Sequence, residues 1–201
     1  MTPSALTRLI LQRTRPYVAL VGKEPLREWT RTGRTPHLVA ELEARGLVEA
    51  YTSAALGELE LDALEVLGRL GHGRPGMALV SIGPGCGHVE AILAERLGLP
   101  RVLLVDTEEG GRGHGWQDYG AAYCDLGEAA DRVRAAAPWC AVTTWNPSLA
   151  PLPPFAFDAL ISLYAMGFHF PRDLYAEWIA ANRKPGAVEI FDTRSGRVTL
   201  G

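Results

Sequence analysis

Three glycines at alternate positions form the clearest chemical signal in the sequence. Gly83, Gly85 and Gly87 lie in the stretch SIGPGCGHVE, between an apolar run and a helix-like pattern. Glycine lets the backbone adopt positive φ angles and lets a ligand approach the main chain closely. Such a loop can hold a pyrophosphate or a nucleoside that carries a sulfonium, or it can be only a tight turn. The residues around the loop distinguish these interpretations.

An acidic residue follows the glycines at the spacing expected of a ribose ligand. Asp106 ends the apolar run VLLVD and lies 19 positions after Gly87. In nucleotide-binding βαβ units, a carboxylate about 20 residues beyond the glycines accepts hydrogen bonds from the ribose hydroxyls. We therefore expect Asp106 to bind a ribose; the alternative is an acid that only terminates a strand.

The segments on either side of the loop indicate an α/β fold. From residue 77 onward, short apolar runs typical of buried strands alternate with helical patterns. We expect strands at 77–83, 101–107, 140–145, 157–165 and 187–194, and helices at 88–98, 127–138 and 170–186. This alternation predicts a doubly wound, mostly parallel sheet with helices on both faces. Ligands bind such sheets beyond the carboxyl ends of the strands, where the glycine loop begins.

The N-terminal third of the chain has a different pattern. Helical spacing of apolar residues is found at 2–13, 35–46 and 57–71. The turn-forming stretch GHGRPG then separates these helices from the first expected strand. We therefore expect two domains: an N-terminal helical cap at 1–74 and a Rossmann-like ligand-binding domain at 75–201.

The glycine spacing favours one class of nucleotide. Dinucleotide folds space their glycines as GxGxxG, whereas this chain reads GPGCG. That pattern resembles motif I of the class I S-adenosylmethionine (SAM)-dependent methyltransferases. The resemblance continues in the family's order through VLLVDTEE, PLPPFAFDALISLYAMGFHFP and RKPGAVEIFDTR, over more than half of the chain. The segment ISLYAMGFHFPRDLY is also similar to bacterial sugar and natural-product O-methyltransferases.

The resemblance implies SAM as the cofactor and a small molecule as the substrate, with a hydroxyl as the favoured acceptor. It implies cofactor contacts from Ser81, Gly83, Pro84, Gly85, Gly87, Asp106, Thr107, Asn146 and Leu163. His169 is the candidate general base, because an imidazole titrates near neutral pH. Tyr164 is the candidate group that orients the acceptor or the cofactor amine. The alternatives are core packing for both aromatic residues and a simple Asn-Pro turn for Asn146.

Two departures from the family pattern leave other functions open. Ser81 stands two positions before the first glycine, where the family often has an acid. The stretch SGRVTLG has room for at most one short strand where the family usually adds two, which indicates a minimal fold, a shortened chain or a sheet completed by another subunit. A catalytically inactive or partner-dependent SAM-binding subunit is therefore the first alternative. An NAD-dependent oxidoreductase is the second, disfavoured by the glycine spacing.

Composition limits the expected partners. The 201 residues carry 20 Lys and Arg against 23 Asp and Glu, a net charge of -3, so nucleic acid is not expected as a partner. No apolar run has the length of a membrane span and no signal peptide is recognisable. Three cysteines without paired spacing are typical of reduced thiols in a cytoplasm and indicate no metal site. The sequence leaves a homodimer and a partner subunit as open alternatives.

Overall fold

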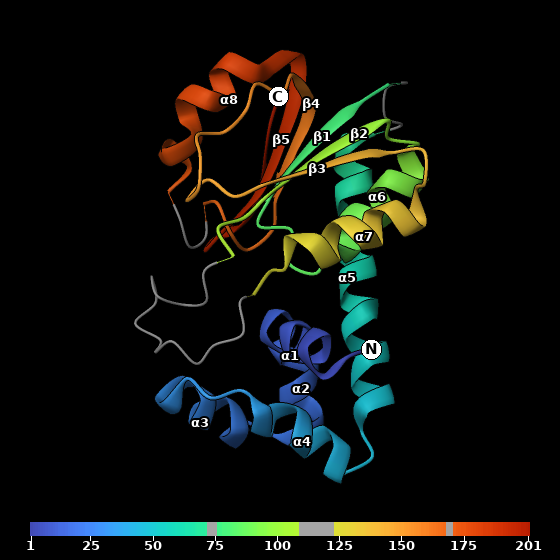
Figure 1. Ribbon diagram of the computed structural model, residues 1–201, viewed down its shortest axis with the longest axis vertical. Helices are drawn as coiled ribbons and strands as arrows, with labels where there is room; N and C mark the ends of the chain where they lie inside the picture. The colour runs from blue at the N-terminus through green and yellow to red at the C-terminus, as the bar shows by residue number, and fades with distance from the viewer. Residues whose placement is uncertain (72–75, 109–122, 168–170) are drawn as a thin grey trace.

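The computed structural model describes residues 1–71, 76–108, 123–167 and 171–201 (Figure 1). Within these residues one sheet has the strand order β3-β2-β1-β4-β5-β6. Its strands are β1 (Ala78–Ile82), β2 (Arg101–Val105), β3 (Ala141–Trp145), β4 (Phe157–Ser162), β5 (Arg183–Thr193) and β6 (Gly196–Leu200). Strands β1 to β5 run parallel and β6 pairs antiparallel with β5. The expected doubly wound, mostly parallel sheet is confirmed, with one short strand after the fifth.

Helices cover both faces of this sheet, which explains the continuous apolar strands. All five residues of β1 are buried. Leu79 belongs to a core shared with α5 (Val48–Leu70), α6 (His88–Leu97) and α7 (Leu126–Ala136). Val80 and Ile82 point into a second core on the opposite face. That face is covered by α8 (Ala176–Asn182), as Figure 1 shows.

The strand order places a crevice beside β1. From β1 the chain passes through α6 to β2 on one side, whereas β4 is the neighbour on the other side. Where the connections of two neighbouring strands lead to opposite sides of the sheet, the carboxyl ends of those strands are left uncovered. The carboxyl ends of β1 and β4 therefore border the topological switch point of the sheet.

The N-terminal helices are more numerous than the sequence pattern indicates. They are α1 (Pro3–Gln12), α2 (Thr14–Val21), α3 (Glu24–Thr32), α4 (Pro36–Ala44) and α5. The Thr2 hydroxyl caps α1 by accepting a hydrogen bond from the Ala5 N–H, and Gly33 ends α3 in the left-handed conformation. Helices α2 and α3 were not expected, and α5 begins nine residues before the expected start at 57. Apolar residues of these helices belong to the same buried core as Leu79.

One predicted element was wrong at its end. The helix expected over 170–186 is instead a 3₁₀ turn (Arg172–Tyr175) followed by α8, which ends at Asn182. Strand β5 begins at Arg183. Proline disfavours helical geometry in the residue before it and cannot donate to a helical hydrogen bond, so Pro185 stops the helix earlier than the pattern indicated.

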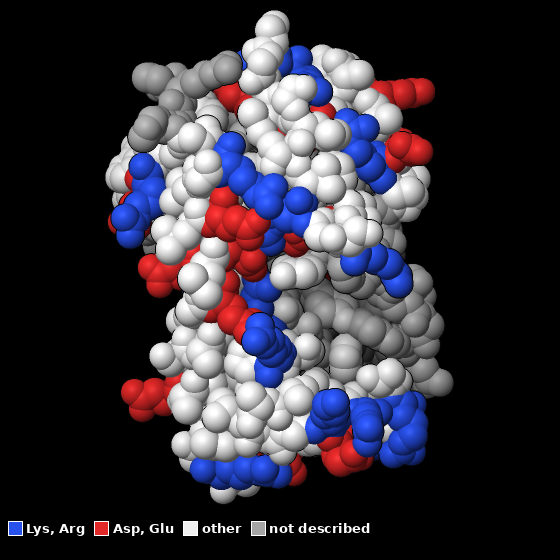
Figure 2. All heavy atoms as spheres, turned by 180° about the vertical axis from the view of Figure 1, so that it is seen from behind, with Lys and Arg blue, Asp and Glu red and all other residues white. Residues whose placement is uncertain are grey.

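Acidic and basic side chains lie next to one another in the middle of the face shown in Figure 2. Among the helices in the described ranges, none has both the length and the apolarity needed to cross a bilayer. The described residues also contain no cluster of three or more His, Cys, Asp or Glu side chains suited to a metal ion.

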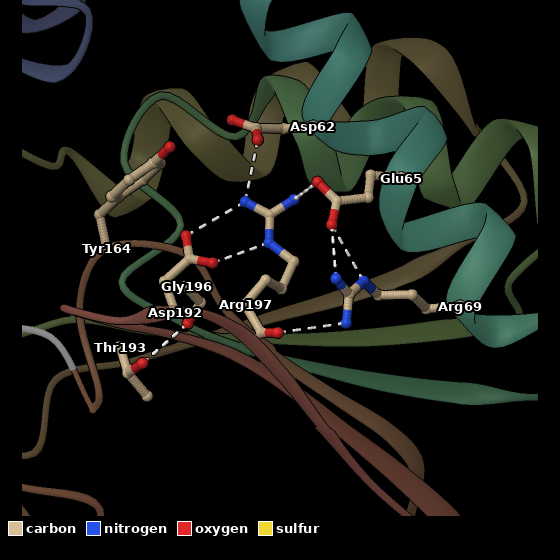
Figure 3. Close-up of a pocket in the computed structure, with 8 residues that line it drawn as sticks. All are labelled: Asp62, Glu65, Arg69, Tyr164, Asp192, Thr193, Gly196 and Arg197. Atoms are coloured by element: carbon tan, nitrogen blue, oxygen red, sulfur yellow. Dashed lines mark hydrogen bonds and ion pairs between the residues drawn. The ribbon is translucent and has the colours of Figure 1, made fainter.

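A buried ion-pair network joins the N-terminal helices to the β5–β6 hairpin (Figure 3). The Asp62 carboxylate on α5 accepts from Arg13 at 2.6 Å and from Arg197 at 2.9 Å. Arg197 on β6 also pairs with Asp192 on β5 at 2.7 Å. These hydrogen-bonded carboxylates raise the pKa of Arg197, although burial opposes the rise. Asp62 is thus the one group in this network that bridges two arginines from opposite ends of the chain.

We expect Asp62→Asn to lower the free energy of unfolding by about 3 kcal/mol, because the buried Arg13 guanidinium loses its carboxylate partner. Arg197, in contrast, keeps Asp192 and Glu65. Urea unfolding followed by circular dichroism measures the change. Glu24→Gln is the control, since Glu24 pairs with Arg27 on the exposed surface and its loss should leave the midpoint unchanged. Equal midpoints for the two variants would contradict the structural role of Asp62.

Candidate functional site

The glycine loop has a left-handed backbone at every second residue. Gly83, Gly85 and Gly87 have φ values of +75°, +59° and +71°, a region that favours glycine. The Gly83 N–H donates to the Val105 carbonyl of β2 at 2.8 Å, and the Gly87 N–H donates to the Pro84 carbonyl at 3.0 Å. The loop is therefore a fixed turn that begins at the carboxyl end of β1, beside the switch point.

Protein atoms pack against all three glycines of this loop. A Cβ atom added at any of them would come closer than van der Waals contact allows. The nearest atoms, in chain order of the glycines, belong to Ala165, Gln12 and Ala129. These residues lie after β4, at the end of α1 and on α7. Three separate elements thus pack against the loop and clamp it. Ala165 and the Ala129 backbone leave no room for a side chain at Gly83 and Gly87, whereas the end of the Gln12 side chain can shift away from Gly85.

Gln12 brings the N-terminal helices into the site. Its Oε1 accepts from the Cys86 N–H at 3.3 Å and its Nε2 donates to the Tyr123 carbonyl at 2.5 Å. The end of α1 is therefore bonded directly to the glycine loop. The sequence reasoning missed this residue, because nothing local in the α1 sequence indicates a contact more than 70 positions away.

Asp106 lies just beyond the end of β2, at the same edge of the sheet as the glycine loop. Its Oδ1 accepts from the Glu108 N–H at 2.7 Å, and the Cys124 thiol is a further hydrogen-bond partner. Burial raises the pKa of the Asp106 carboxyl, and the backbone hydrogen bond from Glu108 opposes this rise. Glu108 itself has φ +55° and accepts from the Leu126 N–H at 2.8 Å, which fixes the turn.

Asn146 joins the ends of two neighbouring strands. Its Nδ2 donates to the Thr107 carbonyl at 2.8 Å, and its Oδ1 accepts from the Ser148 N–H at 2.9 Å. The structure therefore brings Asn146 and Thr107 together beside Asp106, as the parallel arrangement predicts. It also gives Asn146 a structural role, in tying the β3 end to the β2 end.

Tyr164 stands in a strained conformation beyond the end of β4. Its φ is +61°, uncommon for a residue with a side chain, and the residue is 45% exposed. The Arg13 guanidinium carbon lies 5.3 Å from the ring centroid. Tyr164 also lines a hollow of about 290 Å³ with the Asp62 and Arg197 network (Figure 3). The preceding Leu163 is half-buried against the core, and His169 lies outside the described residues.

A buried carboxyl group stands beside Ser81. The Ser81 hydroxyl donates to Oε1 of Glu90 at 2.6 Å, and Glu90 is only 3% exposed. The other oxygen, Oε2, is buried without a hydrogen-bond partner among the described residues. Burial raises the pKa of Glu90 to about 7. The acid that the strand lacks at position 81 is therefore present nearby, supplied by the first turn of α6; the sequence reasoning missed it because it considered only the strand.

Comparison with known proteins identifies the fold. The chain is similar to geranyl diphosphate C-methyltransferase from Streptomyces coelicolor A3(2), solved with Mg²⁺, geranyl diphosphate and S-adenosyl-L-homocysteine. The identity is 21% and the TM-score 0.50, over 73% of this chain and 50% of that chain. The chain has the fold of the class I SAM-dependent methyltransferases.

Other solved structures are similar to the chain at lower scores. A SAM-dependent methyltransferase from Thiobacillus denitrificans, solved with S-adenosyl-L-homocysteine, is 14% identical with a TM-score of 0.45, over 65% of this chain and 47% of that chain. The chain spans about half the length of these methyltransferase structures. Neither protein-family models nor curated proteins give a match.

The clamp on the loop predicts unequal effects of two glycine substitutions. Gly98 also has a positive φ, +60°, but an added Cβ there meets no atom within 4 Å. Gly98→Ala should cost about 1–2 kcal/mol of stability from backbone strain. Gly87→Ala should cost about 2–5 kcal/mol, because its Cβ also meets Ala129 backbone at 2.7 Å. Chemical unfolding measures both, and equal losses would show that the loop is not clamped.

Proposed function

We propose that this protein is a SAM-dependent methyltransferase that methylates a hydroxyl group of a small molecule. One observation carries the proposal. A left-handed glycine loop and the Asp106 carboxyl lie at the carboxyl ends of adjacent strands, beside the switch point of the sheet. This is where a parallel α/β sheet holds a nucleoside.

The residues present fit the parts of SAM. The Asp106 carboxyl is suited to the ribose hydroxyls, and its competing donors are local backbone and a weak thiol donor. Thr107 and Asn146 lie beside it on the side proposed for adenine, and the partly buried Leu163 adds apolar surface. Pro84, also proposed as a cofactor contact, is buried within the loop. The loop from Gly83 to Gly87 borders the rest of the cofactor. When bound, SAM supplies a methyl group on a sulfonium; the chain holds and orients the reactants.

The acceptor is proposed to bind beyond the end of β4. Tyr164 is half-exposed there, and its hydroxyl is suited to orient an acceptor hydroxyl. Burial raises the pKa of Tyr164, so it is a neutral donor at neutral pH. His169 follows five positions later and is proposed as the base that takes the acceptor proton. The favoured acceptor is oxygen because of the likeness of this segment to O-methyltransferases.

Calorimetric titration with SAM, S-adenosyl-L-homocysteine and NAD tests the cofactor. We expect the first two to bind and NAD not to bind. Asp106→Asn should raise both dissociation constants about 10–100-fold, since a charged hydrogen-bond acceptor for the ribose is lost. Asp131→Asn, on the exposed side of α7, is the control and should bind as the wild type does. Failure of the wild type to bind SAM would refute the proposal, and tight NAD binding would favour an oxidoreductase.

Methyl transfer tests the acceptor side, once a screen of hydroxylated small molecules has given a substrate. His169→Gln should lower kcat about 10²–10⁴-fold with the SAM dissociation constant unchanged, because only the proton transfer is lost. Tyr164→Phe should mainly raise KM for the acceptor. His37→Gln is a control on α4, where the ring contacts the Pro25 carbonyl. A kcat for His169→Gln within twofold of the wild type would exclude His169 as the base.

A further inference from the structure

Three charged side chains each retain a buried polar atom without a partner among the described residues: Arg8 and Arg13 at Nε, and Glu90 at Oε2. Arg8 is held by Glu128 on α7 through another nitrogen, which leaves Arg13 and Glu90. Arg13 is 8% exposed and its Nε has no acceptor among the described residues. Glu90 is 3% exposed and its Oε2 has no donor there. Buried polar groups are almost always hydrogen-bonded, because leaving one unpaired forfeits its hydration. The Nε atom of Arg13 and the Oε2 atom of Glu90 therefore have no hydrogen-bond partner within the described residues.

Both side chains lie around the start of the glycine loop. Glu90 is bonded to Ser81, two positions before Gly83. The Arg13 guanidinium lies over the ring of Tyr164, whose neighbour Ala165 packs against Gly83. The residue before Arg13 is Gln12, which is bonded to the loop at Cys86. The two groups thus reach the loop from different elements, the α1–α2 junction and the first turn of α6.

The two charges act on each other without pairing. The positive charge of Arg13 lowers the pKa of Glu90, so the two are close enough for electrostatic interaction. They form no ion pair, and the guanidinium pairs with Asp62 instead. Their unpaired atoms are a donor on a cation and an acceptor on a carboxyl group. A ligand that carries both a carboxylate and an ammonium complements both of them.

We infer that Arg13 and Glu90 bind the amino-acid end of SAM, Arg13 through its carboxylate and Glu90 through its ammonium. The inference rests on the proposed function and assigns one part of that cofactor to two residues. It also explains why position 81 is a serine. The Ser81 hydroxyl holds the Glu90 carboxyl, and Glu90 takes the place of the acid that the family often has on the strand. NAD has no zwitterionic end that would match this pair.

The surroundings of Glu90 agree with such a role. Besides Ser81 on β1 and Arg13, the Cys124 thiol before α7 is within electrostatic range of it. Burial is the largest influence and raises the pKa of Glu90 to about 7. The carboxylate form is therefore costly in the free protein. An incoming ammonium compensates that cost, so binding of the cofactor favours the ionised form.

Two ligands that differ only in the amino-acid end test the inference. S-adenosyl-L-homocysteine carries it, and 5′-methylthioadenosine lacks it. Binding of both is measured by calorimetry for the wild type, Glu90→Gln and Arg13→Lys. Gln keeps a hydrogen-bonding partner for Ser81, and Lys keeps a cation near Asp62 while a methylene replaces Nε. Thermal unfolding establishes that each variant is folded; if Arg13→Lys is not, Glu90→Gln alone decides.

We expect each variant to raise the dissociation constant of S-adenosyl-L-homocysteine at least about tenfold. The dissociation constant of 5′-methylthioadenosine should change less than twofold. Asp106→Asn, in contrast, should raise the dissociation constants of both ligands. Equal effects of Glu90→Gln on the two ligands, or no effect on either, would overturn the inference and leave the proposed function intact. Binding of neither ligand by the wild type would overturn the proposed function and the inference with it.

Discussion

The left-handed glycine loop after β1 constrains more of this structure than any other segment. Three alternate residues with positive φ leave no space for side chains, and three elements use that space: α1 through Gln12, α7 through Ala129 and the end of β4 through Ala165. The N-terminal helices and the sheet are therefore fitted to one another at the loop. Gly83 and Gly85 stay partly exposed at the switch point, where a parallel sheet of this kind binds a ligand.

Buried charge is the second common feature of the cap and the sheet. Asp62 balances Arg13 and shares Arg197 with Asp192, so the network is close to neutral within itself. Its geometry holds the Arg13 guanidinium over Tyr164, at the strand end proposed for the acceptor. The N-terminal helices thereby help to position Gln12 at the glycine loop and Arg13 at Tyr164.

Much of the fold follows from local patterns, and the site only in part. The strands, their mostly parallel direction, the loop and the position of Asp106 after the second strand were predictable, because hydrophobic period and turn chemistry are local properties of the chain. The order of the strands in the sheet was not predicted. Helix α8 ends at Asn182, earlier than predicted, because Pro185 cannot continue a helix. The helix-forming residues before Pro185 led to a predicted helix that was too long. Gln12, Arg13 and Glu90 could not be assigned, since their contacts depend on how the cap packs against the loop. Long-range contacts of this kind leave no periodic signal in one sequence.

A crystal structure of the protein with S-adenosyl-L-homocysteine tests the central claim most directly. The account predicts that the ribose hydroxyls contact Asp106, with the amino-acid end between Arg13 and Glu90 beside Gly83. The nucleoside at another place on the sheet, or bound without contact to Asp106, would contradict it.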